Sequence, residues 1–309
     1  MNLGRFSAIG MILALGFAHA DLRAAERFTI ATYNVENYLD AAAGTRPAKP
    51  ANARAKVRES LLAIRADVVA LEEMGSTNAL IELREALGQD GLHYPHWEHV
   101  AGFDTNIHVA VLSRFPIVDR RPHTQNSFLL RGRRFRVSRG FAEVDIRVHP
   151  GYAFTLIVAH LKSRRIVPEA DEAELREQEA LQLRQIIDAR LTANPQLNLV
   201  VLGDFNDTQD SPSTRLILGR GALALTDTRP AERNGDTDPN PLPQFAPRHV
   251  TWTHFYGKED TFSRIDYILL SRGMAREWDP SATYVLRMPN WGTGSDHRPI
   301  VAGFHAGER

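Results

Sequence analysis

LNLVVLGDFND (Leu197–Asp207) carries the clearest structural signal in the chain: an apolar run that ends abruptly in polar residues. Leu197–Leu202 has the branched apolar side chains typical of a buried strand. Asp204, Asn206 and Asp207 follow directly. A layered α/β fold places its chemistry at strand ends, because the scaffold fixes the geometry there. Asp and Asn are also common turn residues, so this segment alone leaves both interpretations open.

The same arrangement recurs along the chain. Polar residues meet apolar runs at Asn34 and Glu36 after Phe28–Tyr33, Glu72 and Glu73 after Val68–Leu71, His160 after Ala153–Ala159, Asp266 within Arg264–Leu270, and Asp296 and His297 before the last strand. Carboxylates such as Glu36, Glu73 and Asp296 favour Mg²⁺, with Mn²⁺ or Ca²⁺ as alternatives. Carboxylates beside imidazole and amide groups suit metal-assisted hydrolysis of a phosphate ester.

The apolar runs predict many strands and a few helices. We expect strands at Phe28–Val35, Val68–Leu71, Ile107–Leu112, Phe141–Val148, Ala153–Ala159, Leu197–Leu202, Val250–Thr253, Ile265–Leu270 and Pro299–Phe304, with loops at Ala41–Ala53 and Arg229–Pro247. Helices are expected between Asn52 and Asp67, over Asn78–Leu87, and from about Pro168 to Ala193. This mixture predicts an α/β or α+β layered sandwich that forms a single domain.

Composition excludes several classes of protein. The chain has 309 residues, 37 basic and 37 acidic side chains, and no cysteine. Its apolar content is too high for a mainly disordered chain. Without cysteine there is no disulfide framework, thiolate zinc site or cysteine nucleophile. The net charge of zero argues against binding nucleic acid by bulk electrostatics, but it allows a local basic patch.

The N-terminus has the features of an export signal. Arg5 is the one charge among the first twenty residues, Phe6–Phe17 is apolar, and Ala18-His19-Ala20 resembles a cleavage site. We expect residues 1–20 to be a cleaved signal peptide, residues 21–309 to form the domain, and the protein to be periplasmic or secreted. The alternative is an uncleaved anchor. No later segment is apolar enough to insert stably in a membrane, and no obligate protein partner is indicated.

Seven motifs together resemble the endonuclease/exonuclease/phosphatase superfamily, whose members are similar to pancreatic deoxyribonuclease. The motifs are TYNVEN (Thr32–Asn37), DVVALEEM (Asp67–Met74), NIHVAVLSRFPI (Asn106–Ile117), AHLKS (Ala159–Ser163), GDFND (Gly203–Asp207), RIDYILLS (Arg264–Ser271) and SDHRP (Ser295–Pro299). They occur in the family's order. The resemblance implies a four-layered α/β sandwich: two mixed β-sheets packed face to face, with helices outside.

The resemblance also implies roles for individual residues. Asn34, Glu36, Glu73 and Asp296 would form the metal site, with Glu73 as the principal ligand. His160 and Asn206 would contact the phosphate, Asp204 would position or deprotonate the attacking water, Asp266 would orient His297, and His297 would stabilise the transition state or transfer a proton. Glu72 stands where the family often has Gln, and strand alternation predicts that it points away from Glu73. His160 stands near the position at which the repair-type members carry a Tyr. This departure from the family pattern weakens an abasic-site repair assignment.

Charge placement gives the main internal indication of a substrate. Arg114–Arg139 contains eight arginines and one acid, Asp119, for a net charge of +7. These arginines either bind a phosphodiester backbone or pair with the acidic helix from Glu169 to Glu179. Candidate substrate-binding residues are Arg114, Arg133, Arg134, Lys162 and Arg164, and candidate stacking rings are Trp252, Phe255, Tyr256 and Trp291.

Three classes of function remain open. The first is an exported, metal-dependent nuclease or related phosphodiesterase that acts on DNA or RNA. The second is a phosphatase or phospholipase C-type hydrolase of a lipid headgroup or small phosphoester. The third is a non-catalytic binding module on the same fold. The catalytic set argues against the third class, because a binding module has no need of every one of those residues.

Overall fold

A computed structural model describes residues 26–233 and 249–307. The expected signal peptide, residues 1–20, and most of the expected loop Arg229–Pro247 lie outside the described residues. Among the described residues, no helix is both long and apolar enough to span a bilayer.

The first sheet has six strands in the order β15-β16-β1-β2-β4-β3. It is mixed, because β1 runs parallel to β2 and antiparallel to β16. Its strands are β1 (Glu26–Tyr38), β2 (Val68–Met74), β3 (His96–Val100), β4 (His108–Ser113), β15 (Trp278–Val285) and β16 (Ile300–Ala306).

The second sheet also has six strands, in the order β11-β14-β10-β9-β8-β5. It too is mixed, because β10 runs parallel to β9 and antiparallel to β14. Its strands are β5 (Ile117–His123), β8 (Phe141–His149), β9 (Tyr152–Ala159), β10 (Leu199–Asp204), β11 (Thr226–Asp227) and β14 (Asp266–Leu270). Two hairpins complete the strands: β6 (Ser127–Leu130) with β7 (Arg133–Arg136), and β12 (His254–Tyr256) with β13 (Thr261–Ser263).

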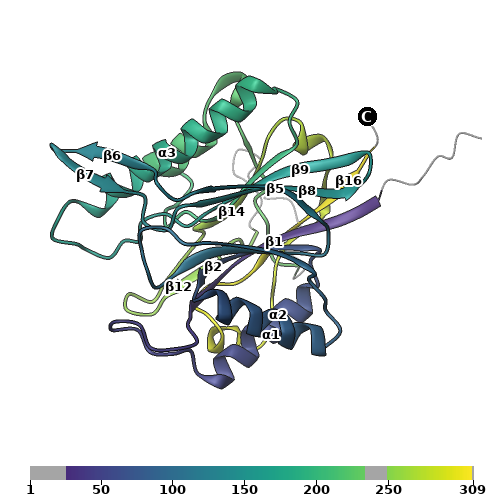
Figure 1. Ribbon diagram of the computed structural model, residues 1–309, viewed down its shortest axis with the longest axis horizontal. Coiled ribbons are helices and arrows are strands. Elements are labelled where there is room, and N and C mark those ends of the chain that lie inside the picture. The colour runs from purple at the N-terminus through teal and green to yellow at the C-terminus, as the bar shows by residue number, and fades with distance from the viewer. Residues whose placement is uncertain (1–25, 234–248, 308–309) are drawn as a thin grey trace, which may run out of the picture.

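Helices cover the outer face of each sheet (Figure 1). They are α1 (Ala51–Ile64), α2 (Thr77–Gln89), α3 (Glu172–Ala193) and α4 (Pro212–Leu218), with short 3₁₀ turns η1 (Gly221–Leu223), η2 (Met274–Arg276) and η3 (Trp291–Thr293). Val57, Leu61 and Ile64 turn one face of α1 into the core, as their spacing predicts. Asp171 begins α3 by accepting hydrogen bonds from the backbone of Ala173 and Glu174.

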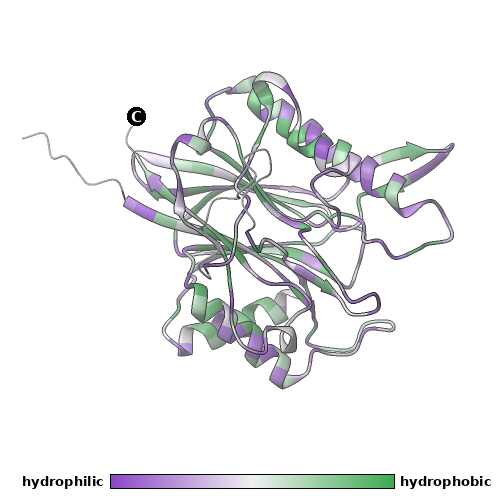
Figure 2. Ribbon diagram, turned by 180° about the vertical axis from the view of Figure 1, so that it is seen from behind, coloured by the Kyte–Doolittle hydropathy of each residue, from purple (hydrophilic) through white to green (hydrophobic). Residues whose placement is uncertain are grey.

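Three separate apolar cores hold the layers together. One lies between the sheets and includes Phe28 and Phe154. A second joins the first sheet to α1 and α2, and a third joins the second sheet to α3. Hydropathy in Figure 2 follows this division, with apolar strands inside and polar helix faces outside. Three cores require four layers, so the expected four-layered α/β sandwich of two mixed sheets is confirmed.

Some expected boundaries are wrong. Val250–Thr253 is not a strand, and the strand in this region is β12, which begins at His254. The backbone of Val250 instead accepts a hydrogen bond from Glu232. The helix expected from Pro168 begins at Glu172, because the side chain of Asp171 caps it there. Strands β3, β5 and β15 were not expected.

Strand pairing brings the polar residues to one end of the sandwich. Asn34 pairs with Glu72 across the parallel strands β1 and β2. Asp204 pairs with Asp266 across β10 and β14, and His160 directly follows β9, the parallel neighbour of β10. The backbone of Asp204 accepts a hydrogen bond from Leu161, which closes the two strand ends against each other.

Candidate active site

Unusual backbone conformations shape this end of the sandwich. Glu36, Glu73 and Asn206 have φ angles of 43°, 59° and 55°, in the left-handed region that non-glycine residues seldom adopt. Such conformations cost on the order of 1 kcal/mol or more each and cluster at functional sites. At Gly203, φ is 129° and a Cβ atom would lie 2.0 Å from the carbonyl oxygen of Ala159. Glycine therefore lets β10 approach β9 and places Asp204 beside His160.

Three buried side chains form the centre of the site. Nδ1 of His297 lies 2.9 Å from Oδ2 of Asp266, so the carboxylate fixes the orientation of the ring. Nε2 of His297 then faces Oδ2 of Asp204 at 3.7 Å. The ligand atoms of Asp204, Asp266 and His297 all lie within 4.8 Å of one another.

The charges at this centre favour a protonated His297. Burial alone would lower the pKa of His297, but the carboxylates of Asp266, Asp204 and Asp296 outweigh burial and hold that pKa well above its usual range. Burial raises the pKa of Asp204, and the charge of His297 opposes this shift. The cluster thus holds an imidazolium ion beside carboxylates, where it can stabilise negative charge that develops on a phosphoryl group.

His160 has the opposite electrostatic character. Burial, followed by the charge of Arg139, holds the pKa of His160 well below its usual range, so the ring stays neutral. Its Nε2 atom lies 3.6 Å from Oδ2 of Asp204 and 3.9 Å from Oε1 of Glu73. A neutral imidazole at this point can donate one hydrogen bond to a bound phosphate without adding charge.

Two amide side chains hold Asp204 in place. Nδ2 of Asn34 donates to Oδ2 of Asp204 at 3.0 Å. The backbone N–H of Asn206 donates to Oδ1 of Asp204 at 2.8 Å, and the side-chain amide of Asn206 donates to Oδ2 of Asp204 at 3.2 Å and to the carbonyl of Leu161 at 3.0 Å. The structure therefore brings together all five predicted catalytic residues: His160, Asp204, Asn206, Asp266 and His297.

The predicted metal ligands lie beside this centre. Oε2 of Glu73 accepts the backbone N–H of Asn37 at 2.8 Å, and Oδ1 of Asn34 accepts that of Glu36 at 2.9 Å. Burial, then the charge of Asp296, raises the pKa of Glu36. The ammonium of Lys49 lies 4.0 Å from Oε2 of Glu36.

These oxygen atoms fit a divalent cation. The charges of Asp296, Lys49, Glu73 and His297 all act on Glu36, and hard oxygen ligands such as these carboxylates suit Mg²⁺, Mn²⁺ or Ca²⁺. A bound ion would supply Lewis-acid activation of the phosphoryl group. Asp296 also lies near His297, with Oδ1 3.9 Å from Nε2, so it borders both the metal ligands and the catalytic centre.

The predicted substrate-binding residues are scattered. Arg114 lies at the far end of the first sheet, where it pairs with Asp67 at 2.8 Å. The ammonium of Lys162 donates to the carbonyls of Ser163 and Arg165 in its own loop. Arg164 lies beside the site and contacts the Asn206 carbonyl. Arg133 and Arg134 are exposed on β7.

Two residues beside the site were not predicted to belong to it. Arg139 is buried behind His160 and donates to the carbonyl of Leu161 at 3.2 Å. His254 lies against His297 with ring centroids 4.6 Å apart. Neither belongs to a quoted motif, and the contact of His254 depends on pairing between segments more than forty residues apart.

Glu72 points away from its neighbour Glu73, toward the space between the sheets, where the charges of Asp204 and Asp266 act on it. It is fully buried, and Oε1 accepts a hydrogen bond from Thr32 at 2.7 Å. Burial holds the pKa of this carboxyl well above its usual range, which favours the uncharged form. A neutral carboxyl carries the same charge as the Gln that the family resemblance suggested for this position.

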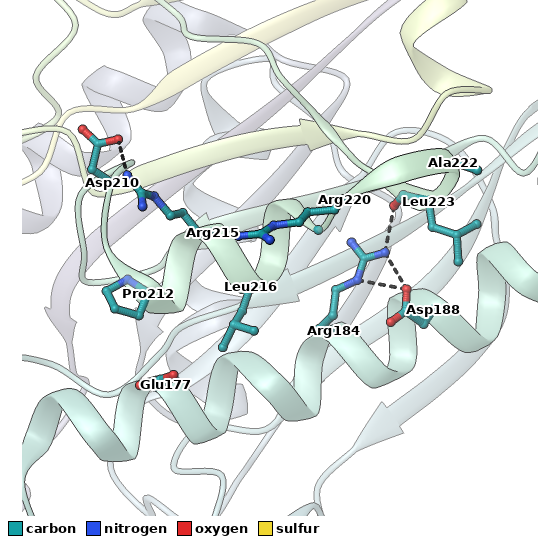
Figure 3. A pocket seen from close by; sticks show the side chains of 11 residues that line it. Glu177, Arg184, Asp188, Asp210, Pro212, Arg215, Leu216, Arg220, Ala222 and Leu223 are labelled. Atoms are coloured by element: carbon teal, nitrogen blue, oxygen red, sulfur yellow. Dashed lines mark hydrogen bonds and ion pairs between the residues drawn. The ribbon is translucent and has the colours of Figure 1, made fainter.

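A groove of about 580 Å³ lies elsewhere, between α3 and α4 (Figure 3). It contains none of the predicted catalytic or metal-binding residues. Its most buried cation, Arg184, is already used by Asp188 and by the carbonyls of Ile217 and Leu223. Arg184 therefore ties α3 to α4.

Comparison with known proteins identifies the family. The sequence model of the Endonuclease/Exonuclease/phosphatase family matches residues 31–297, so the chain belongs to this family. Its members are phosphoester hydrolases, including nucleases and phosphatases, and they depend on divalent metal ions. A search of curated proteins finds no match to the chain.

Solved structures share the fold at low sequence identity. The catalytic domain of human Nocturnin with bound sulfate is 16% identical with a TM-score of 0.62, covering 90% of this chain and 94% of that one. Sphingomyelinase C from Streptomyces griseocarneus is 19% identical with a TM-score of 0.58, covering 91% and 100%. The 3′ phosphatase NExo from Neisseria, bound to a product DNA hairpin, is 21% identical with a TM-score of 0.57, covering 90% and 99%. At these identities the likeness shows the fold alone.

Proposed function

We propose that this protein is an exported, divalent-metal-dependent nuclease or phosphodiesterase. The hydrolase part rests on the buried centre of Asp204, Asp266 and His297 beside the carboxylates of Glu36 and Glu73. Export rests on the N-terminal signal pattern. Mg²⁺ is the proposed ion, because the candidate ligands are oxygen atoms.

One observation favours nucleic acid as the substrate. Arg133, Arg134 and Arg136 lie on β7, in a hairpin that projects from the active-site end of the second sheet (Figure 1). The other arginines of the Arg114–Arg139 segment pair with carboxylates, but in the described part of the chain these three have no carboxylate within 4.0 Å. Arginines without a carboxylate partner, at the same end of the molecule as the candidate site, suit a phosphodiester backbone.

A second candidate substrate has support of its own. Leu129 at the β6–β7 hairpin and Ile166 in the loop after His160 are 65% and 87% exposed. Exposed aliphatic side chains near arginines also suit the surface of an anionic membrane. We therefore retain a lipid-headgroup phosphoester hydrolase as the alternative.

One experiment tests the proposal. Purified residues 21–309 are incubated with plasmid DNA, RNA, sphingomyelin vesicles and a phosphoinositide, each with Mg²⁺, Mn²⁺, Ca²⁺ or EDTA. We expect cleavage of DNA or RNA that EDTA abolishes and that His297→Ala lacks. Cleavage of lipid alone would favour the alternative, and equal turnover by wild type and His297→Ala would refute both.

A further inference from the structure

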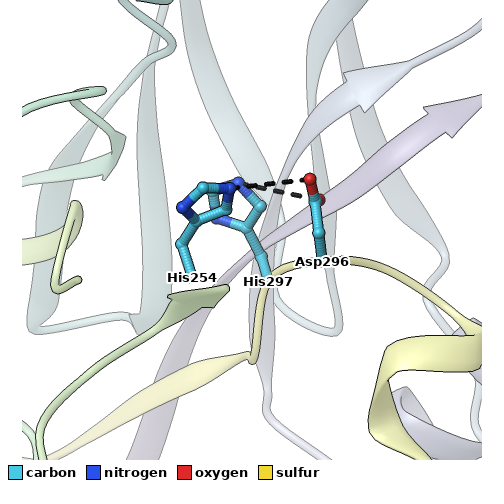
Figure 4. Close-up of side chains that lie close together, drawn as sticks. All are labelled: His254, Asp296 and His297. Carbon is cyan, nitrogen blue, oxygen red and sulfur yellow. Dashed lines mark ion pairs between the residues drawn. The ribbon is translucent and has the colours of Figure 1, made fainter. Parts of the chain in front are cut away.

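His254 is an imidazole in the site that no motif assigns. Its strand, β12, runs antiparallel to the segment that carries His297. His254 and His297 form a backbone bridge, flanked by hydrogen bonds from Phe255 to Asp296 at 3.0 Å and from Arg298 to Thr253 at 2.7 Å. Directly opposed residues present their side chains on one face, and the two rings accordingly lie 4.6 Å apart (Figure 4).

His254 contacts Asp296 and keeps part of its side chain exposed to a ligand. Its Nε2 atom lies 3.6 Å from Oδ2 of Asp296, within ion-pair distance, and its side chain is 15% exposed. Asp296 stands between the two imidazoles, because its other oxygen lies 3.9 Å from Nε2 of His297. The N–H groups of His254 and His297 thus border the same space as the metal ligand Asp296.

Tyr256 is the next side chain after His254 on the same face of β12. Residues two apart on a strand share a face, so Tyr256 lies on the same side of β12 as His254. The two rings are nearly parallel, with centroids 6.4 Å apart and planes at 26°, and Tyr256 is 40% exposed. Phe255 turns the other way and packs on Phe262 at 4.7 Å, which anchors the back of the strand.

We propose that β12 forms a nucleotide subsite. His254 donates a hydrogen bond to the phosphoryl group bound at His160 and His297, and Tyr256 stacks on the base of the nucleoside attached to it. This inference rests on the proposed nuclease function and makes it specific. Stacking on an aromatic side chain tolerates any base, because every base has a flat π-face.

Matched diesters test the role of Tyr256. Thymidine 5′-(p-nitrophenyl) phosphate, ethyl p-nitrophenyl phosphate and p-nitrophenyl phosphorylcholine share a leaving group and differ in the other ester. We expect Tyr256→Ala to lower kcat/KM for the thymidine ester about 5- to 100-fold, mainly through KM, and to affect the ethyl ester far less. Tyr256→Phe, which keeps the ring, should retain most of the affinity for thymidine monophosphate measured by calorimetry.

The outcomes separate the inference from the proposed function. Equal losses on the thymidine and ethyl esters, or a larger loss on the choline ester, would overturn the nucleotide subsite while the hydrolase assignment stands. A wild type that cleaves none of the esters would refute the proposed function. Calorimetry would still decide the subsite in that case, because equal binding of thymidine monophosphate by wild type and Tyr256→Ala would overturn it.

Two variants test His254. His254→Phe keeps a ring against His297 and removes the N–H, whereas His254→Gln keeps a donor and removes the ring. We expect the Phe variant to lose about 10-fold or more in kcat/KM on both the thymidine and ethyl esters, to bind inorganic phosphate more weakly, and to be less active than the Gln variant. The reverse order would assign His254 to packing. Loss of bound Mn²⁺ in His254→Phe, measured by electron paramagnetic resonance, would make it a metal ligand and overturn the phosphate contact.

Discussion

Two buried carboxylate clusters in this protein have opposite electrostatic designs. In the first, Glu143 on β8 contacts Arg121 at 2.7 Å, Arg190 at 2.6 Å and His123 at 2.7 Å. Arg121 also pairs with Asp119 and with Asp145, so three carboxylates share three basic side chains. Burial alone would raise the pKa of Glu143, but the hydrogen bonds and charges of these partners outweigh burial and lower the pKa to about 2. At the active site, Asp204, Asp266 and Asp296 share a single imidazolium, His297. A cluster with matched charges stabilises the fold, whereas one with excess carboxylate has capacity for a cation.

The largest expected effect comes from removing the histidine of the active-site cluster, which should reduce catalysis. His297→Ala removes the imidazolium that Asp204, Asp266 and Asp296 share, and we expect kcat to fall about 10³-fold, or ~4 kcal/mol. His123→Ala removes a histidine from the Glu143 cluster and should leave kcat within about 2-fold of wild type. Steady-state kinetics on a p-nitrophenyl diester measures both. Similar losses in the two variants would mean that the clusters do not differ in function.

Glu143→Gln should lower the free energy of unfolding, and the size of this loss should depend on pH. The folded-state pKa of Glu143 is below its unfolded value, so its stabilisation is complete above about pH 4.5 and is lost as the pH falls toward about 2. We expect a loss of roughly 3 kcal/mol at pH 7 and a smaller variation of stability with pH between 4.5 and 2. Urea unfolding monitored by circular dichroism at several pH values measures this. An unchanged free energy of unfolding at pH 7 would contradict the matched-charge account.

A Glu-to-Gln substitution at Glu73, unlike that at Glu143, should not lower the stability of the metal-free protein. Glu73→Gln removes one carboxylate from a group that already has excess negative charge, so the metal-free variant should be at least as stable as metal-free wild type. Saturating Mg²⁺ should stabilise the wild type by about 2.7 kcal/mol at 100 times the dissociation constant, and the variant much less. Thermal unfolding with EDTA and with Mg²⁺ distinguishes the two. Equal stabilisation of both proteins would remove Glu73 from the metal site.

Sequence patterns predicted the parts of the fold with strong periodicity. The inner strands β1, β9, β10 and β14 are buried on both faces and appear as continuous apolar runs. Strands β3, β5 and β15 lie at sheet edges, and β5 (IVDRRPH) and β15 (WDPSATYV) carry charges and proline. Edge strands avoid uniform apolar patterns because these would promote aggregation, so they were not recognised.

Sequence patterns likewise predicted some residues of the candidate site and not others. Asp204, Asp266 and His297 each stand in a local motif, and strand pairing brings them together as the family resemblance implied. His254 has no local signal, since its position follows from the bridge to His297. The net charge of the Arg114–Arg139 segment did not show which of its arginines are paired, because pairing with Asp67, Glu98, Glu143, Glu174 and Asp104 occurs between residues distant in sequence.

The smallest expected effect concerns the arginines without such partners. Arg133→Ala with Arg134→Ala should reduce the salt dependence of DNA binding, lowering the slope of log K against log[salt] by about 2, since each phosphate contact contributes about 0.9 for duplex DNA. Arg114→Ala with Arg120→Ala removes the same charge from paired positions and is the matched control. Fluorescence anisotropy of a labelled duplex, with Ca²⁺ and an inactive His297→Ala background, measures both slopes. If the two pairs reduce the slope equally, the protein's overall charge governs binding; if neither does, β7 does not contact the backbone.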